Sequence, residues 1–207
     1  MQFDNQKSSG VPSKHQIILI TILVEGGLAV LAWMLGGAVN QSPLADFRWD
    51  KIGFGIGIIA TLPMLGMLLV LLRWPIGPLA NLKQLLHRFI PSIFAGCTLT
   101  QLAFISLMAG VGEEILFRGV LQGVASRWLG TGYGLAVASG LFGLMHCITL
   151  TYVFVASLMG IYLGWVWQVS DNLLAPIITH ALYDFLALVY FVRFGGRPES
   201  MDETDEC

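Results

Sequence analysis

Apolar runs long enough to cross a membrane fill most of this sequence. One run extends from about Gln16 to Val39, and a second extends from Ile52 to Leu72. An α-helix needs about 20 mainly apolar residues to cross the hydrocarbon core of a bilayer. Only 12% of the residues are charged, against about 25% in ordinary soluble domains. The 207 residues are therefore expected to form an all-α, polytopic transmembrane helical bundle with about six to eight membrane helices.

The second half of the chain is almost continuously apolar. We expect further spans there, near residues 92–111, 133–147, 149–169 and 173–194. Between 113 and 129 we expect a helix whose depth in the membrane the sequence leaves open. The segment 73–88 mixes prolines, glycine and basic residues with leucines at helical spacing. This composition favours a short amphipathic helix lying on the membrane surface.

These runs divide the chain into four parts. They are a polar N-terminal segment (1–15), two spans with the surface helix (16–90), an apolar helical core (91–194) and an acidic, disordered tail (195–207). Basic residues near the first two spans fall on one side if each span crosses once: Lys7, Lys14, Arg73, Lys83 and Arg88. Cytoplasmic loops carry an excess of Lys and Arg, so we expect an integral, multi-pass membrane protein with a cytoplasmic N-terminus.

The net charge and the positions of the cysteines argue against nucleic-acid binding, a disulfide framework and a cysteine metal site. The net charge is −2 and the basic residues are scattered, so nothing indicates nucleic-acid binding. The three cysteines, Cys97, Cys147 and Cys207, are widely separated, which excludes a disulfide framework and a CxxC metal pair. We expect Cys97 and Cys147 to be small buried hydrophobes.

Three ionisable side chains interrupt the apolar region at Glu113, Glu114 and Arg118. Ionisable groups at membrane depth are costly, and they usually face a protein interior or a wet cavity. On a helix, Glu114 and Arg118 share a face and can pair, whereas Glu113 points about 100° away. We interpret Glu114 with Arg118 as an orienting pair and Glu113 as the working carboxylate. Glu25, in the first run, is interpreted instead as a carboxylate turned toward a neighbouring helix.

Three more ionisable residues, His146, His180 and Asp184, lie within predicted apolar helices downstream. His180 and Asp184 are four residues apart and share a helical face. If they cluster with Glu113 around one wet cavity, most of the cost of burying them is removed. Such a cluster can activate water: a carboxylate takes the proton, a histidine positions the water, and other donors stabilise the developing oxyanion.

The same atoms allow a second chemistry. Glu113, His146, His180 and Asp184 are a plausible nitrogen and oxygen ligand set for zinc, with a bound water as nucleophile. The HExxH signature of many zinc proteases is absent. A third hypothesis is a proton relay in a transporter, where Glu and His also lie inside membranes. The sequence leaves open whether the site uses no cofactor or a divalent metal such as zinc.

The order of these motifs resembles a known family. Three motifs follow one another on successive predicted helices: Glu113-Glu114-x-x-x-Arg118, Phe142-x-x-x-His146 and His180-x-x-x-Asp184. This pattern is similar to that of the CPBP (CAAX protease and bacteriocin-processing) intramembrane proteases. That family includes the CAAX prenyl endopeptidases, which remove the last three residues of prenylated proteins. The resemblance covers roughly residues 90–190 and leaves the first two spans outside.

The resemblance implies a role for each motif residue. Glu113 would be the general base that activates water, and His146 would help to hold that water. Arg118 would orient the motif through Glu114. The family has been described both as metal-dependent and as glutamate-type, so the resemblance leaves the metal question open.

The third motif departs from the pattern of several family members, which have Asn where this sequence has Asp184. By the resemblance, His180 and residue 184 would stabilise the oxyanion. An ionised Asp cannot donate a hydrogen bond to an oxyanion, whereas Asn can. Asp184 would therefore have to be protonated, hold His180 in place, or ligate a metal.

Two classes of function follow from the sequence. We expect an enzyme: an intramembrane endopeptidase that hydrolyses a peptide bond of a membrane-associated protein or peptide. One branch of the family acts on prenylated substrates, so the resemblance allows a lipidated substrate, and membrane lipid is the other expected partner. The alternative is a non-proteolytic membrane protein of the same fold, either a transporter or a scaffold or immunity-type protein, whose activity would survive loss of Glu113.

Overall fold

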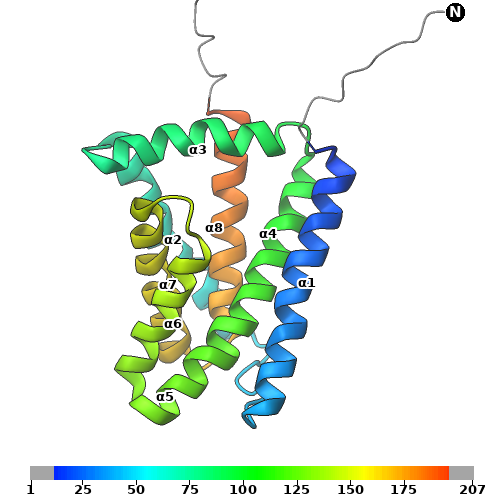
Figure 1. Ribbon diagram of the computed structural model, residues 1–207, viewed down its shortest axis with the longest axis vertical. Coiled ribbons are helices and arrows are strands. Elements are labelled where there is room, and N and C mark those ends of the chain that lie inside the picture. Colours follow the sequence, from blue (N-terminus) through cyan, green and yellow to red (C-terminus); the bar gives the residue numbers. More distant parts are fainter. Residues whose placement is uncertain (1–11, 196–207) are drawn as a thin grey trace, which may run out of the picture.

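The computed structural model describes residues 12–195, which form a bundle of helices (Figure 1). The helices follow the chain in this order: α1 (Lys14–Ala38), α2 (Lys51–Arg73), α3 (Pro78–Phe94), α4 (Leu99–Glu114), the π-helix η1 (Ile115–Gln122), α5 (Gly123–Leu129), α6 (Thr131–Met145), α7 (Leu150–Ser170) and α8 (Leu174–Arg193). The expected all-α class is confirmed. Most of the expected polar segment 1–15 and almost all of the expected tail 195–207 lie outside the described residues.

Four helices, α1, α2, α7 and α8, are long and apolar enough to cross a membrane. A bent pair, consisting of α3 and the continuous helix from Leu99 to Leu129, raises this number to as many as five if it counts as one broken span. The apolar helix α6 has only 15 residues, fewer than the about 20 that a crossing needs. Within residues 12–195, four to five of the expected six to eight membrane helices therefore meet the length of a full span.

The span expected to begin near Ser92 begins instead at Leu99, the first residue of α4. The helix α3 continues to Phe94, and the chain bends by 113° before α4 begins. Thr98 caps α4, because its Oγ1 accepts a hydrogen bond from the Gln101 N–H at 3.3 Å while Gln101 Oε1 accepts one from the Thr98 N–H at 2.9 Å. This reciprocal capping box fixes the start of a new helix. As a result, α3 lies across one end of the bundle (Figure 1).

The helix α8 runs through the middle of the bundle and packs closely on α2 and α4 (Figure 1). Glycines allow the close approach on both sides. A methyl group on Gly57 would lie 2.6 Å from Cβ of Ile178, and one on Gly110 would lie 2.9 Å from Cβ of Ala181. The Thr179 hydroxyl also donates to the Gly57 carbonyl at 3.1 Å. These contacts fix the rotation of α8 that turns His180 toward α4.

Basic residues gather at the end of the bundle that α3 covers. They come from the start of α1, the end of α2, the helix α3 and the end of α8: Lys14, Arg73, Lys83, Arg88 and Arg193. The described acidic loop residues, Asp46, Asp50 and Asp171, lie in the connections at the opposite end. Arg48, Lys51 and Arg127 also lie at that opposite end. The cytoplasmic N-terminus itself stays a prediction.

Candidate active site

The first motif spans the junction between α4 and the π-helix η1. Glu114 and Arg118 are 0% and 1% exposed. Nη1 of Arg118 donates to Oε1 of Glu114 at 2.8 Å, and Nη2 donates to the Gly160 carbonyl of α7 at 3.0 Å. The guanidinium also lies over the ring of Phe142, 4.8 Å from its centroid. The predicted Glu114–Arg118 pair is therefore confirmed, and it joins η1 to α6 and α7. Local π-helical geometry is frequent at functional sites.

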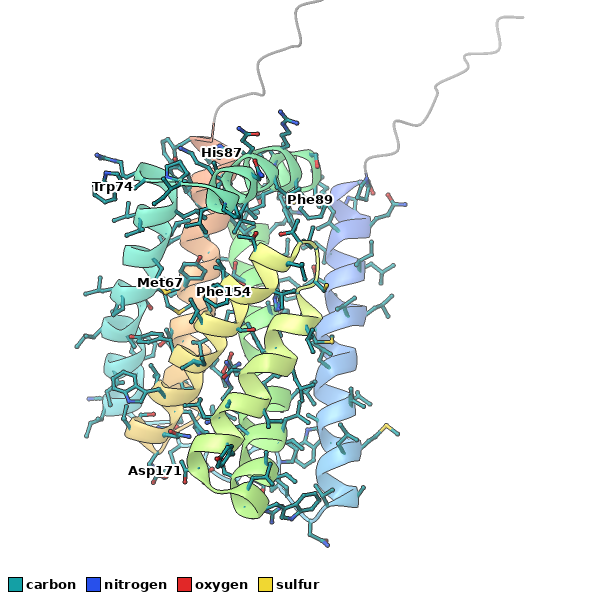
Figure 2. All side chains as sticks on the ribbon, turned by 60° about the vertical axis from the view of Figure 1, so that its left-hand side comes forward. Met67, Trp74, His87, Phe89, Phe154 and Asp171 are labelled. Atoms are coloured by element: carbon teal, nitrogen blue, oxygen red, sulfur yellow. The ribbon has the colours of Figure 1, made fainter. Side chains whose placement is uncertain are left out.

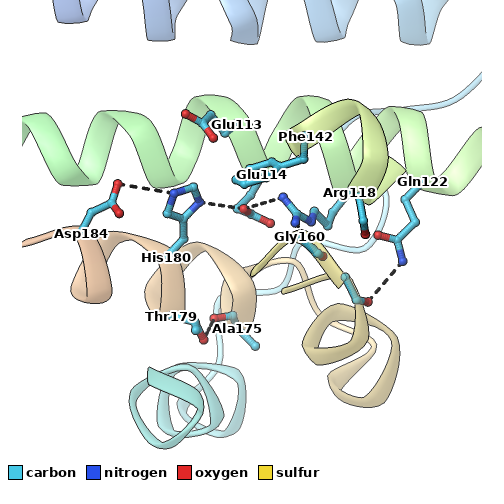
Figure 3. A network of polar contacts seen from close by, with 12 residues as sticks. Glu113, Glu114, Arg118, Gln122, Phe142, Gly160, Ala175, Thr179, His180 and Asp184 are labelled. Carbon is cyan, nitrogen blue, oxygen red and sulfur yellow. Dashed lines mark hydrogen bonds and ion pairs between the residues drawn. The ribbon is translucent and has the colours of Figure 1, made fainter. Parts of the chain in front are cut away.

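His180 continues this pair into a row of polar side chains (Figure 3). Its Nδ1 lies 2.8 Å from the same Glu114 Oε1, and its Nε2 lies 3.4 Å from Oδ2 of Asp184. In the imidazolium form, both ring nitrogens carry a hydrogen, and each of them faces a carboxylate. The row Arg118–Glu114–His180–Asp184 then alternates in charge, which compensates for burying so many ionisable groups. The sequence did not predict the contact between His180 and Glu114.

Glu113 stands apart from this row and points in another direction (Figure 3). Its Oε2 lies 3.9 Å from Nε2 of His146, which is too long for a direct hydrogen bond. His146 follows the last turn of α6, and its Nδ1 lies 2.9 Å from the Phe142 carbonyl oxygen. A carbonyl only accepts, so Nδ1 carries the hydrogen and, in the neutral ring, the lone pair of Nε2 faces Glu113. Oε2 of Glu113 is buried and has no hydrogen-bond partner among the described residues.

A cavity of about 270 Å³ opens beside these residues, between α2, α3, α7 and α8. His146, His180 and Asp184 line it, together with two tyrosines, Tyr152 and Tyr183. The rest of the wall is apolar, and α3 contributes several of its side chains. Sequence reasoning missed the tyrosines, because a tyrosine in an apolar helix is an ordinary core or interface residue. The only signal was their proximity in sequence to His146 and Asp184.

The same region of the chain matches a protein family. Residues 95–186 match the family model described as type II CAAX prenyl endopeptidase Rce1-like. This part of the chain, 92 of the 207 residues, is similar to the Rce1-like family. The Rce1-like region begins at the bend between α3 and α4 and ends just after Asp184, so it contains all three motifs. No curated protein and no solved structure matches the chain. This similarity supports a protease, and the apolar helices agree with an integral membrane protein.

The four residues predicted as metal ligands do not form one cluster in the Rce1-like region. Within residues 12–195, no group of three or more His, Cys, Asp or Glu side chains is arranged to hold a metal ion. Both ring nitrogens of His180 face carboxylates, which engages the second imidazole of the predicted set. Catalytic zinc sites use three protein ligands. The predicted zinc set of Glu113, His146, His180 and Asp184 therefore does not fit this arrangement.

Glu25 and the cysteines lie outside the three motifs. Glu25 of α1 faces α4 as predicted, since a methyl group on Gly112 would lie 3.2 Å from its Oε2. Cys97 is buried as expected, whereas Cys147 is exposed in the turn after His146. The expectation for Cys147 was wrong because α6 ends before it and leaves it outside the packed helix. Cys207 lies outside the described residues.

Proposed function

We propose that this protein is an intramembrane endopeptidase that hydrolyses a peptide bond of a membrane-associated substrate. The observation that carries this proposal is the separation of 3.9 Å between Glu113 Oε2 and His146 Nε2. The carboxylate oxygen and the Nε2 lone pair are both acceptors. One water molecule can donate a hydrogen to each of them across such a gap. The pair therefore has the geometry to hold and activate a water.

The reaction follows from this placement. The water oxygen forms a bond to the carbonyl carbon of the scissile peptide as Glu113 takes one of its protons. The carbonyl oxygen becomes an oxyanion in the tetrahedral intermediate. The C–N bond then breaks, and Glu113 returns the proton to the leaving amine. His146 orients the water throughout and keeps its own Nδ1 hydrogen on the Phe142 carbonyl.

His180 is the first candidate donor to the oxyanion. It borders the cavity, and the distance of 3.4 Å from its Nε2 to Asp184 is longer than a typical hydrogen bond. The Nε2 hydrogen is therefore available to a stronger acceptor in the transition state. Its Nδ1 remains anchored to Glu114, which Arg118 holds from the other side. Glu114 and Arg118 are thus positioning residues in this proposal.

The surroundings of the cavity favour a substrate with apolar groups. A second apolar pocket of about 340 Å³ lies between α2 and α7, and Met67 and Phe154 line it (Figure 2). The pocket and the cavity share the side chains of Leu68, Met159 and Tyr183. An apolar or lipidated part of a substrate can therefore lie against α2 and α7 while its peptide bond reaches His146. The prenyl endopeptidases in the description of the matched family support this choice.

A cleavage assay tests the proposal. The purified protein, reconstituted in lipid vesicles, is incubated with membrane-anchored peptides with and without a prenylated cysteine, and products are identified by mass spectrometry. We expect cleavage at one defined bond, and we expect the Glu113→Ala and His146→Ala variants to fold normally without cleaving. Full cleavage by both variants would overturn the mechanism. A transport or partner phenotype that survives Glu113→Ala, without any cleavage, would favour the non-proteolytic alternative.

A further inference from the structure

We propose that Tyr152 is a further catalytic residue, whose phenolic O–H donates a hydrogen bond to the oxyanion. This inference rests on the proposed endopeptidase function and concerns a residue outside the three motifs. The cavity wall offers few hydrogen-bond donors for an oxyanion. His146 uses its Nδ1 hydrogen on the Phe142 carbonyl, so its Nε2 accepts. Asp184, when ionised, only accepts.

His180 Nε2 is then the one imidazole donor that faces the cavity. Effective oxyanion sites present preorganised donors, usually more than one, where the charge develops. Members of the family with Asn at the third motif have an amide that can donate at that position, whereas this chain has Asp184. The second donor must come from another polar residue of the wall. The remaining ones are the hydroxyls of Tyr152 and Tyr183.

Tyr152 is the better placed of the two tyrosines. It lies in the first turn of α7, where its backbone N–H donates to Oγ1 of Thr149 at 3.1 Å. Its ring meets that of His146 edge-on, with centroids 5.9 Å apart and an interplanar angle of 89°. His146 in turn stacks on Phe142 at 4.7 Å. This wall of three rings fixes Tyr152 relative to the residue that positions the water.

The hydroxyl of Tyr152 is also free for a substrate. It makes no hydrogen bond to any of the residues from 12 to 195, in contrast to the hydroxyl of Tyr162, which donates to the Ala60 carbonyl at 2.9 Å. Tyr183 belongs to α8 and borders both the cavity and the apolar pocket between α2 and α7. Tyr183 is therefore placed to contact the apolar part of a substrate.

The step needs no additional reactant. As water attacks and Glu113 takes the proton, the carbonyl π electrons move to oxygen. The oxyanion accepts hydrogen bonds from His180 Nε2 and from the Tyr152 hydroxyl, and neither proton is transferred. When the C–N bond breaks, the carbonyl re-forms and both hydrogen bonds weaken. Tyr152 therefore stabilises the transition state more than the bound substrate.

The Tyr152→Phe variant, which removes one oxygen atom, tests the inference in the reconstituted cleavage assay. We expect kcat to fall by about 100-fold, as for loss of one oxyanion donor, with little change in KM. Binding of a peptide phosphinate, whose tetrahedral anion resembles the intermediate, should weaken by a similar factor. Binding of an uncleavable substrate-like peptide should stay unchanged. A purely structural role for Tyr152 would not separate the two ligands.

A double variant makes the test specific to the donor shortage. Asp184→Asn supplies an amide donor, so in that background Tyr152→Phe should lower kcat by less than about 10-fold. Tyr162→Phe, from the same helix, is the matched control and should keep the kcat of the wild type. The inference is overturned if Tyr152→Phe keeps kcat within about twofold, or if Tyr183→Phe shows the loss instead. Glu113→Ala, measured alongside, separates a failure of this inference from a failure of the proposed function.

Discussion

Nδ1 of His180 and Oε1 of Glu114 lie 2.8 Å apart, and the same Glu114 oxygen accepts a hydrogen bond from Arg118 at 2.8 Å. This contact connects the second of the paired glutamates to the third motif, 66 residues further along the chain. The two glutamates therefore differ in their surroundings. Oε1 of Glu114 faces two donors in the core, whereas Oε2 of Glu113 lies 3.9 Å from His146 and has no hydrogen-bond partner among the described residues.

Arg118→Ala is expected to destabilise the protein by about 3–5 kcal/mol, because the buried Glu114 carboxylate loses the ion pair with Arg118 and keeps the contact with His180. Thermal unfolding of the purified protein in detergent measures this effect. Arg127→Ala is the matched control, since this exposed arginine donates to two backbone carbonyls at 3.3–3.5 Å, and it should change stability by less than about 0.5 kcal/mol. Equal unfolding temperatures for the two variants would contradict the role assigned to Arg118.

Gly143→Ala is expected to lower both stability and cleavage, because Gly143 lies where α6 crosses α7. A methyl group there would overlap Oγ of Ser157 and lie 2.6 Å from the Val153 carbonyl oxygen. The backbone oxygen cannot move without shifting the end of α6, which carries His146. Gly140→Ala on the same helix meets nothing within 4 Å and should be neutral or slightly stabilising. If both variants cleave like the wild type, the position of His146 does not depend on this crossing.

Removal of divalent metals is expected to leave cleavage unchanged. Within residues 12–195, no three His, Cys, Asp or Glu side chains are arranged to hold a metal ion, whereas catalytic zinc sites use three protein ligands. The purified protein is treated with a chelator, its residual metal content is measured, and its cleavage rate is compared with that of an untreated sample. A rate that disappears on chelation and returns with added zinc would show that the side chains rearrange around a metal.

The sequence predicts those parts of the structure that depend on helical periodicity. Apolar runs predicted the helices of the bundle, and a spacing of four residues predicted the Glu114–Arg118 pair. Each of these features depends on one helix and the face that it presents.

Features that depend on how separate helices meet could not be predicted in the same way. The pairing of His180 with Glu114 requires the rotation and height of α8 against α4, which many small contacts along the interface determine together. The same holds for Tyr152, whose role depends on the crossing of α6 and α7. The bend before α4 did have a local signal, the capping box of Thr98 and Gln101, but the apolar run around it concealed the break.

The most direct measurement of the proposed chemistry is the cleavage rate of the Glu113→Gln variant in lipid vesicles, beside the wild type. Glutamine keeps the size of the side chain but cannot take a proton from water at this step. We expect kcat to fall by about 100-fold or more, with an unchanged unfolding temperature, because Glu113 Oε2 has no hydrogen-bond partner among the residues described here. A folded Glu113→Gln variant that cleaves within about twofold of the wild-type rate would contradict the assignment of Glu113 as the general base.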